Sequence, residues 1–100
     1  MPKKKIAPVH PGVFIAELLQ ELGLSQAQLA KHIHVSPMRI NHVINERRPV
    51  TAELALRLGQ YFKQSPRYWL NLQARYDLDL AEDQHASLIA RQVHPYSAVA

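Results

Sequence analysis

The chain has 100 residues, of which 47% are hydrophobic and 20% charged; this predicts one soluble globular domain with its own core. It contains no cysteine, which excludes disulfide bonds, thiolate metal sites and a cysteine nucleophile, and fits a reducing cytoplasm. The formal net charge of +4 favours an anionic partner, nucleic acid first. No apolar run approaches the roughly 20 residues that span a bilayer, and the basic start lacks the apolar segment of a secretory signal. We therefore expect a cytoplasmic protein without a membrane partner.

Residues 1–9 contain Lys3, Lys4, Lys5 and two prolines, and they predict a flexible basic arm. The arm could be a solvated tail, a segment that enters a DNA groove, or a contact for another protein. A first helix is predicted to begin at Pro11, where the missing N–H costs nothing. It is predicted to end at Gly23, because glycine is favoured just past a helix end.

Two short helices separated by a tight turn are predicted next. Ser25 caps the first of them and forms a capping-box pattern with Gln28, three residues on. After His34 and Val35, Ser36 caps the second, whose first residue is a proline. Short adjacent helices joined in this way form a helix-turn-helix arrangement. Its predicted inner positions are small or aliphatic: Leu29, Ala30, Ile33, Ile40 and Val43.

The second helix of this pair carries polar side chains on its outer face. Arginine matches the two acceptors of guanine, asparagine matches the acceptor and donor of adenine, and methionine can contact the thymine methyl group. Residues at the start of the first helix and just after the second are placed to contact phosphates. Such a face is most often solvated surface, but its place in a helix-turn-helix of a basic protein favours DNA contact. The predicted DNA-binding residues are Gln26, Ser36, Pro37, Met38, Arg39, Asn41, His42, Asn45, Arg47 and Arg48.

Two residues depart from the usual helix-turn-helix pattern. His34 occupies a turn position that is often glycine, although histidine is enriched among non-glycine residues with positive φ. Glu46 follows Asn45 where glycine is common, and it would bring negative charge close to the DNA phosphates.

A fourth helix is predicted from a cap at Thr51 to about Phe62, and a fifth begins at Pro66 after another serine cap. The fifth helix is expected to fade between Asp79 and Glu82, because its apolar periodicity weakens there.

No stretch shows convincing alternation with a period of two, so no strand is predicted. The predicted fold class is therefore all-α, with five short helices in a compact domain. This domain is expected to cover residues 10–82. Residues 83–100 are expected to form a tail with room for one short helix.

The fifth helix and the residues after it offer more apolar area than one side of a small helix must bury. A single recognition helix reads only a few base pairs, and two-fold dimers place two such helices about 34 Å apart. We therefore expect a homodimer, although some of these apolar residues could equally belong to the core. The candidate interface residues are Tyr68, Leu72, Tyr76, Leu78 and Leu80.

The six histidines do not form a metal-binding pattern. His32 and His34 are two residues apart and would point in different directions on a helix, and no histidine pair has a spacing of four. No nucleophile elbow, phosphate-binding loop or carboxylate pair is present. We therefore predict no metal, no cofactor, no catalytic residue and no enzymatic activity.

Several motifs resemble those of a known family. The order Leu-Ser-Gln at 24–26, Leu-Ala at 29–30 and Val-Ser at 35–36 is similar to lambda-repressor-like helix-turn-helix domains of the XRE family. More specific are His-Pro-Gly at 10–12 and SPRYWLNLQARYDL at 65–78, which resemble the HigA/VapI-type antitoxins of bacterial toxin–antitoxin pairs. The resemblance covers residues 10–82.

This resemblance implies a lambda-repressor-like fold and two activities. The protein would bind operator DNA of its own operon as a homodimer, and it would neutralise a cognate RNA-cleaving toxin of HigB type. Toxin contact could use the arm, the first helix or the tail after Asp83. Two alternatives are a stand-alone helix-turn-helix repressor without a toxin partner, and an interaction module that has lost DNA binding. Glu46 argues for the last of these.

Overall fold

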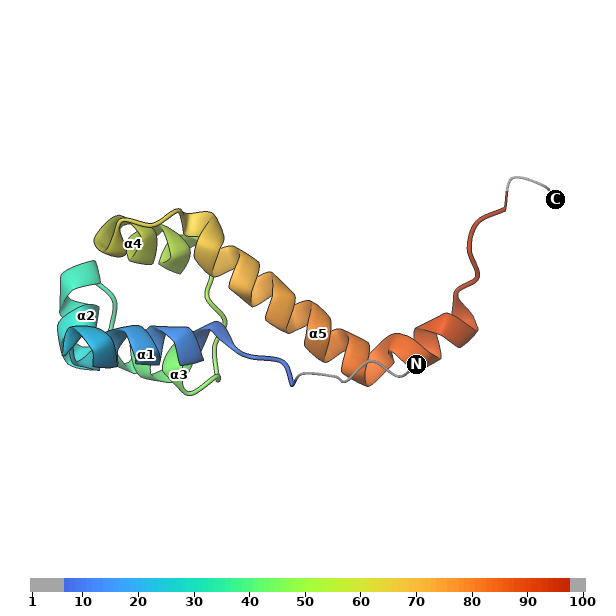
Figure 1. Ribbon diagram of the computed structural model, residues 1–100, viewed down its shortest axis with the longest axis horizontal. Helices are drawn as coiled ribbons and strands as arrows, with labels where there is room; N and C mark the ends of the chain where they lie inside the picture. The colour runs from blue at the N-terminus through green and yellow to red at the C-terminus, as the bar shows by residue number, and fades with distance from the viewer. Residues whose placement is uncertain (1–6, 98–100) are drawn as a thin grey trace.

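The computed structural model describes residues 7–97, and within this range it contains helices and no strand (Figure 1). The helices are α1 (Pro11–Leu22), α2 (Gln26–Ile33), α3 (Pro37–Ile44), α4 (Ala52–Phe62) and α5 (Pro66–Gln92). The all-α prediction is confirmed. Most of the predicted arm, including Lys3, Lys4 and Lys5, lies outside the described residues.

The helix boundaries follow the caps that the sequence predicted. Ser25 Oγ accepts a hydrogen bond from the Gln28 N–H at 3.0 Å, and Gln28 Oε1 accepts one from the Ser25 N–H at 2.8 Å, which completes the capping box. Gly23 ends α1 with a φ of 64°. His34 ends α2 with a φ of 58°, the left-handed conformation that histidine tolerates better than most residues. Local signals therefore fixed where the first helices start and stop.

The core lies where the first four helices meet the beginning of α5. Trp69 is its largest side chain and is fully buried. Each fully buried leucine or isoleucine contributes roughly 1.5–3 kcal/mol relative to an exposed one, so this set dominates the stability of the fold. The buried apolar residues are Ile15, Leu19, Leu29, Ala30, Ile33, Ile40, Val43, Val50, Leu54, Ala55, Leu58 and Trp69.

The start of α1 packs closely against the end of α3. A Cβ atom added to Gly12 would lie 2.1 Å from the Val43 carbonyl oxygen and 3.0 Å from the Ile44 Cα. Only a glycine lets the two backbones approach this closely. The contact supports α3 from the core side.

Helix α5 is longer than predicted. It was expected to fade between Asp79 and Glu82, but one helix continues to Gln92 and projects beyond the other four helices (Figure 1). Residues 81–97 are all exposed, so the second half of α5 has no buried apolar stripe. Hydrophobic periodicity reports a buried face rather than helical backbone, which explains the error. The domain boundary at residue 82 stays a prediction.

Candidate DNA-binding surface

Helix α3 turns its apolar side to the core and its polar side outward. Ile40 and Val43 are buried, whereas Met38 is 66% exposed. His42 is half-buried, and the remaining positions of the outer side are open. The predicted residues on this outward side are Pro37, Met38, Asn41, His42 and Asn45.

Three amide side chains form a hydrogen-bonded ladder that joins α2 to α3. Asn45 Nδ2 donates to Asn41 Oδ1 at 3.1 Å, and Asn41 Nδ2 donates to Gln26 Oε1 at 3.2 Å. Each bond joins an amide nitrogen to an amide oxygen, and each of the three amides keeps further donor and acceptor capacity. The ladder therefore holds in one arrangement three side chains of a kind that can bond adenine or phosphate.

Arg39 lies on the flank of α3 that faces α4. Its Nη1 donates to Glu53 Oε1 at 3.0 Å and its Nη2 donates to Thr51 Oγ1 at 2.9 Å, and the side chain is 23% exposed. These bonds tie the start of α3 to the start of α4. They also engage both terminal nitrogens, which a bidentate pair with guanine would need. Reading of a base by Arg39 stays a prediction.

Glu53 bridges Arg39 and Arg57, whose Nη2 lies 3.1 Å from Glu53 Oε2. The hydrogen bond from Arg39, followed by that from Arg57, lowers the pKa of the Glu53 carboxyl. The Glu53 carboxylate therefore stays ionised to a lower pH than an ordinary glutamate does.

The loop after α3 presents Arg47 and Arg48, both exposed. Their backbone N–H groups donate to the His42 carbonyl oxygen at 2.8 and 3.3 Å, which places the loop directly at the end of α3. Glu46 adopts a φ of 63°, the left-handed conformation that glycine would take without strain. Ser36, also predicted as a DNA contact, uses its Oγ to accept the Arg39 N–H at 3.1 Å.

Two buried polar residues behind this loop were not predicted. His10 caps α1, with its Nδ1 accepting a hydrogen bond from the Gly12 N–H at 2.9 Å. Gln73 Oε1 accepts a hydrogen bond from the Val50 N–H at 2.8 Å. Histidine is not among the favoured capping residues, so the sequence did not indicate that His10, although part of the His-Pro-Gly motif, is a cap. Gln73 did give a signal, because it is a polar residue one helical turn after Trp69 and therefore lies on the inward side of α5.

The stability of the fold should depend on the protonation of His10. Burial lowers the pKa of His10 below its ordinary value of 6.5, against the raising effects of Glu46, the Arg48 backbone and Asp77. The unfolded chain therefore binds the proton more readily, so the stability from neutral His10 is present above the unfolded pKa and is lost as the pH falls below it. We expect urea denaturation to show a lower free energy of unfolding at about pH 5 than at about pH 7.

His10→Asn should reduce this pH dependence, because asparagine keeps a capping oxygen for α1 but does not titrate. His85→Asn, on the exposed half of α5, is the matched control and should leave it unchanged. The same loss of stability in parent and His10→Asn would contradict the assignment.

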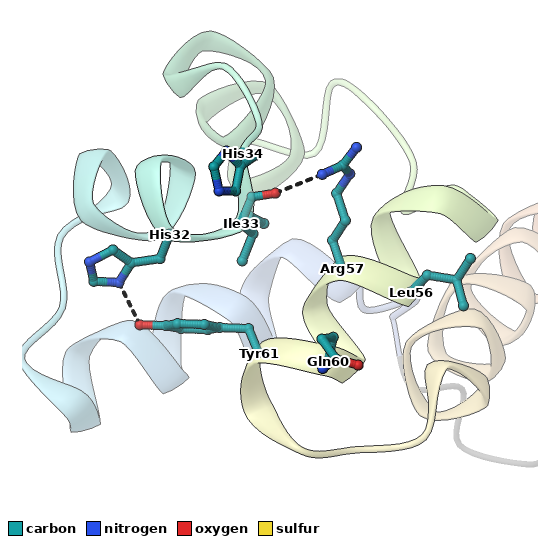
Figure 2. A pocket seen from close by; sticks show the side chains of 7 residues that line it. All are labelled: His32, Ile33, His34, Leu56, Arg57, Gln60 and Tyr61. Atoms are coloured by element: carbon teal, nitrogen blue, oxygen red, sulfur yellow. Dashed lines mark hydrogen bonds between the residues drawn. The ribbon is translucent and has the colours of Figure 1, made fainter.

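A groove with a volume of about 480 Å³ separates the end of α2 from α4 (Figure 2). His32 Nδ1 and the Tyr61 hydroxyl are 2.7 Å apart, and Arg57 Nη1 donates to the Ile33 carbonyl oxygen at 3.0 Å. These two bonds fix α2 against α4. The groove is lined by His32, Ile33, His34, Leu56, Arg57, Gln60 and Tyr61, none of which was predicted to bind DNA.

The five predicted dimer residues differ in how exposed their side chains are. Leu72 packs against the core, Tyr76 contacts the His10 ring edge-on with centroids 4.9 Å apart, and Leu80 is half-buried. Tyr68 and Leu78 are exposed, Leu78 at 60%. Further exposed apolar residues, which were not predicted, lie later in the chain: Leu88, Ile89 and Val93. The homodimer and its interface stay predictions.

Across residues 7–97, no three histidine or carboxylate residues are grouped so that they could hold a metal ion. No helix in the same range combines the length and apolar character needed to cross a bilayer.

The tight α2–α3 pair defines a helix-turn-helix protein, and the family profile described as helix-turn-helix matches residues 15–69. Virulence-associated protein I of Dichelobacter nodosus is 45% identical over 86% of this chain and 81% of its own length. An addiction module antidote protein of the HigA family from Coxiella burnetii is 40% identical, with a TM-score of 0.89 over 91% of this chain and 100% of that one.

The Pseudomonas aeruginosa antitoxin HigA, solved with the higBA promoter, is 36% identical, with a TM-score of 0.85 over 90% of this chain and 99% of that one. The chain therefore belongs to the HigA antitoxin family of helix-turn-helix proteins.

Proposed function

We propose that this chain represses its own toxin–antitoxin operon as a homodimer and neutralises an RNA-cleaving toxin of HigB type encoded beside it. The observation that carries the DNA-binding part is the exposed outer side of α3, with its amide ladder to α2. The solved complex of the Pseudomonas aeruginosa relative with a promoter supports the same use of this fold.

In the proposed complex, α3 lies in the major groove and its outer side contacts base edges. Asn41 and Asn45 are suited to adenine, and Met38 to a thymine methyl group. Gln26, at the first position of α2, is placed to bond a phosphate together with the free N–H groups of that helix end. Arg47 and Arg48 contact the backbone from the loop after α3 and supply affinity for any sequence.

The toxin-neutralising part is supported by membership of the antitoxin family. It predicts an adjacent reading frame whose product stops growth when expressed alone and permits growth when expressed with this chain. The two products should also co-purify.

Two measurements test the proposal. A duplex carrying the DNA upstream of this gene should bind more tightly than a random-sequence duplex of equal length, and Arg47→Ala should weaken binding to both. Equal affinity for the two duplexes would overturn operator recognition. Harmless neighbouring reading frames, together with specific DNA binding, would instead indicate a stand-alone repressor.

A further inference from the structure

Two buried polar side chains from distant parts of the sequence hold the loop between α3 and α4 from behind. His10 is 3% exposed and Gln73 is 7% exposed. His10 is the cap of α1, and Gln73 lies in the first half of α5. Both line one hollow of about 320 Å³ together with loop residues 46–49. The loop is therefore supported by elements that do not belong to the helix-turn-helix pair.

Gln73 fixes the end of the loop. Its Oε1 accepts the Val50 N–H at 2.8 Å in a buried setting. Val50 follows Pro49 and precedes the α4 cap, so its N–H has no partner within a helix, and a buried N–H without an acceptor is costly. Gln73 Nε2 donates to Asp77 Oδ1 at 2.9 Å, which sets the orientation of the amide. Gln73 thus fixes the position of Val50 relative to α5.

His10 supports the middle of the loop. Its Nδ1 is engaged with the α1 backbone, and its ring rests edge-on against Tyr76 at 4.9 Å and 72°. His10 and Arg48 line the same hollow, and hydrogen bonding to the Arg48 backbone raises the pKa of His10. The ring is held on two sides, so it fixes the Arg48 backbone relative to α1 and α5.

The remaining anchor lies at the other end of the loop, where the Arg47 and Arg48 N–H groups bond the His42 carbonyl oxygen. Both arginine side chains are exposed. A phosphate contact requires the guanidinium within hydrogen-bond distance of a fixed oxygen. Long exposed side chains on an unanchored loop would meet this condition only part of the time.

From these contacts we infer that Gln73 and His10 are positioning residues for DNA binding, which hold Arg47 and Arg48 in reach of phosphates without touching DNA. The inference rests on the proposed function, since it needs Arg47 and Arg48 to contact the backbone. It also means that α5 acts on the DNA-binding surface through Gln73 and, by way of Tyr76, through His10.

The test compares Gln73→Met with a paired exchange, Gln73→Glu with Asp77→Asn. Methionine keeps the length of the side chain but accepts no strong hydrogen bond. The paired exchange keeps one carboxylate, an acceptor for Val50 and a donor between positions 73 and 77, so net charge is unchanged. Binding of a random-sequence duplex is measured over a range of salt concentrations, after circular dichroism has confirmed folding of each variant.

Gln73→Met should weaken binding and flatten the slope of log affinity against log salt by about 1–2, as for the loss of one or two phosphate contacts. The paired exchange should keep the parental slope. His10→Asn, which keeps a cap for α1, should flatten the slope by about 1, and it provides the test if Gln73→Met does not fold. A purely structural role would lower the melting temperature and leave the slope unchanged, which would overturn the inference.

Failure of the proposed function gives a different result. The double variant Arg47→Ala with Arg48→Ala should flatten the slope by about 2. If this variant binds as the parent does, the proposed phosphate contacts are wrong. If it weakens binding while Gln73→Met and His10→Asn retain the parental slope, only the positioning role is wrong.

Discussion

Replacing Gly12 with alanine is expected to lower the free energy of unfolding by about 3 kcal/mol or more, at the upper end of the range for overpacked cores. The added Cβ would lie 2.1 Å from the Val43 carbonyl oxygen and 2.9 Å from the Val43 carbonyl carbon. These are backbone atoms near the end of α3, so no side chain can rotate away to make room. Either α1 or α3 must move, and the core between them opens. Urea denaturation followed by circular dichroism measures the loss.

Gly23→Ala is the matched control for this substitution. Gly23 has a φ of 64°, and an added Cβ there would meet no atom within 4 Å. The only cost is the left-handed backbone, about 1–2 kcal/mol for a residue with a Cβ. At position 12, inside α1, alanine is a better helix former than glycine by up to about 1 kcal/mol, so without a clash Gly12→Ala would not lose stability. An unchanged or raised stability for Gly12→Ala would therefore show that the close approach of α1 and α3 is relaxed in solution.

Replacing Asn41 with alanine is expected to weaken binding to the upstream duplex by about 1–3 kcal/mol, or roughly 5- to 150-fold. The substitution removes the middle of the ladder, because Asn41 bonds both Gln26 and Asn45. It therefore removes one base contact and releases two further side chains from their fixed arrangement. Fluorescence anisotropy with labelled duplexes measures the change.

Two controls make this result specific to sequence reading. Binding of Asn41→Ala to a random-sequence duplex should fall much less, because Arg47 and Arg48 keep their phosphate contacts and only Gln26 is released. Asn71→Ala removes an exposed asparagine from α5 and should leave binding to both duplexes unchanged. Equal losses on both duplexes would mean that Asn41 acts through the fold or on the backbone, and no loss on either would place α3 outside the groove.

The parts of the fold that the sequence predicted are those set by neighbouring residues. Caps such as Ser25 and Thr51 accept hydrogen bonds from N–H groups of the turn that follows them, so about four or five consecutive residues determine the start of a helix. The left-handed turn at His34 was also expected from local backbone preference. The outward orientation of Met38 followed from its position opposite Ile40 and Val43 in the helical repeat.

The parts that the sequence did not reveal depend on contacts between distant residues. The outer face of α3 suggested that Arg39 is available to DNA, but its partner Glu53 lies on another helix. The hydrogen bond between Gln73 and Val50 joins residues 23 positions apart, and no local sequence pattern predicts it. The second half of α5 was missed because residues 81–97 are exposed, and a helix without a buried face shows no amphipathic periodicity.

The exposed half of α5 has a consequence for how the molecule unfolds. Its buried residues are confined to the first two turns, at Trp69 and Gln73, and isolated helices of about 12–15 residues are marginal in water. We therefore expect backbone amides beyond residue 81 to exchange with solvent through local fraying, and those near Trp69 to require opening of the core. A molecule that binds the second half of α5 must hold this marginal helix in its folded form. The free energy needed to order the helix lowers the affinity of that molecule.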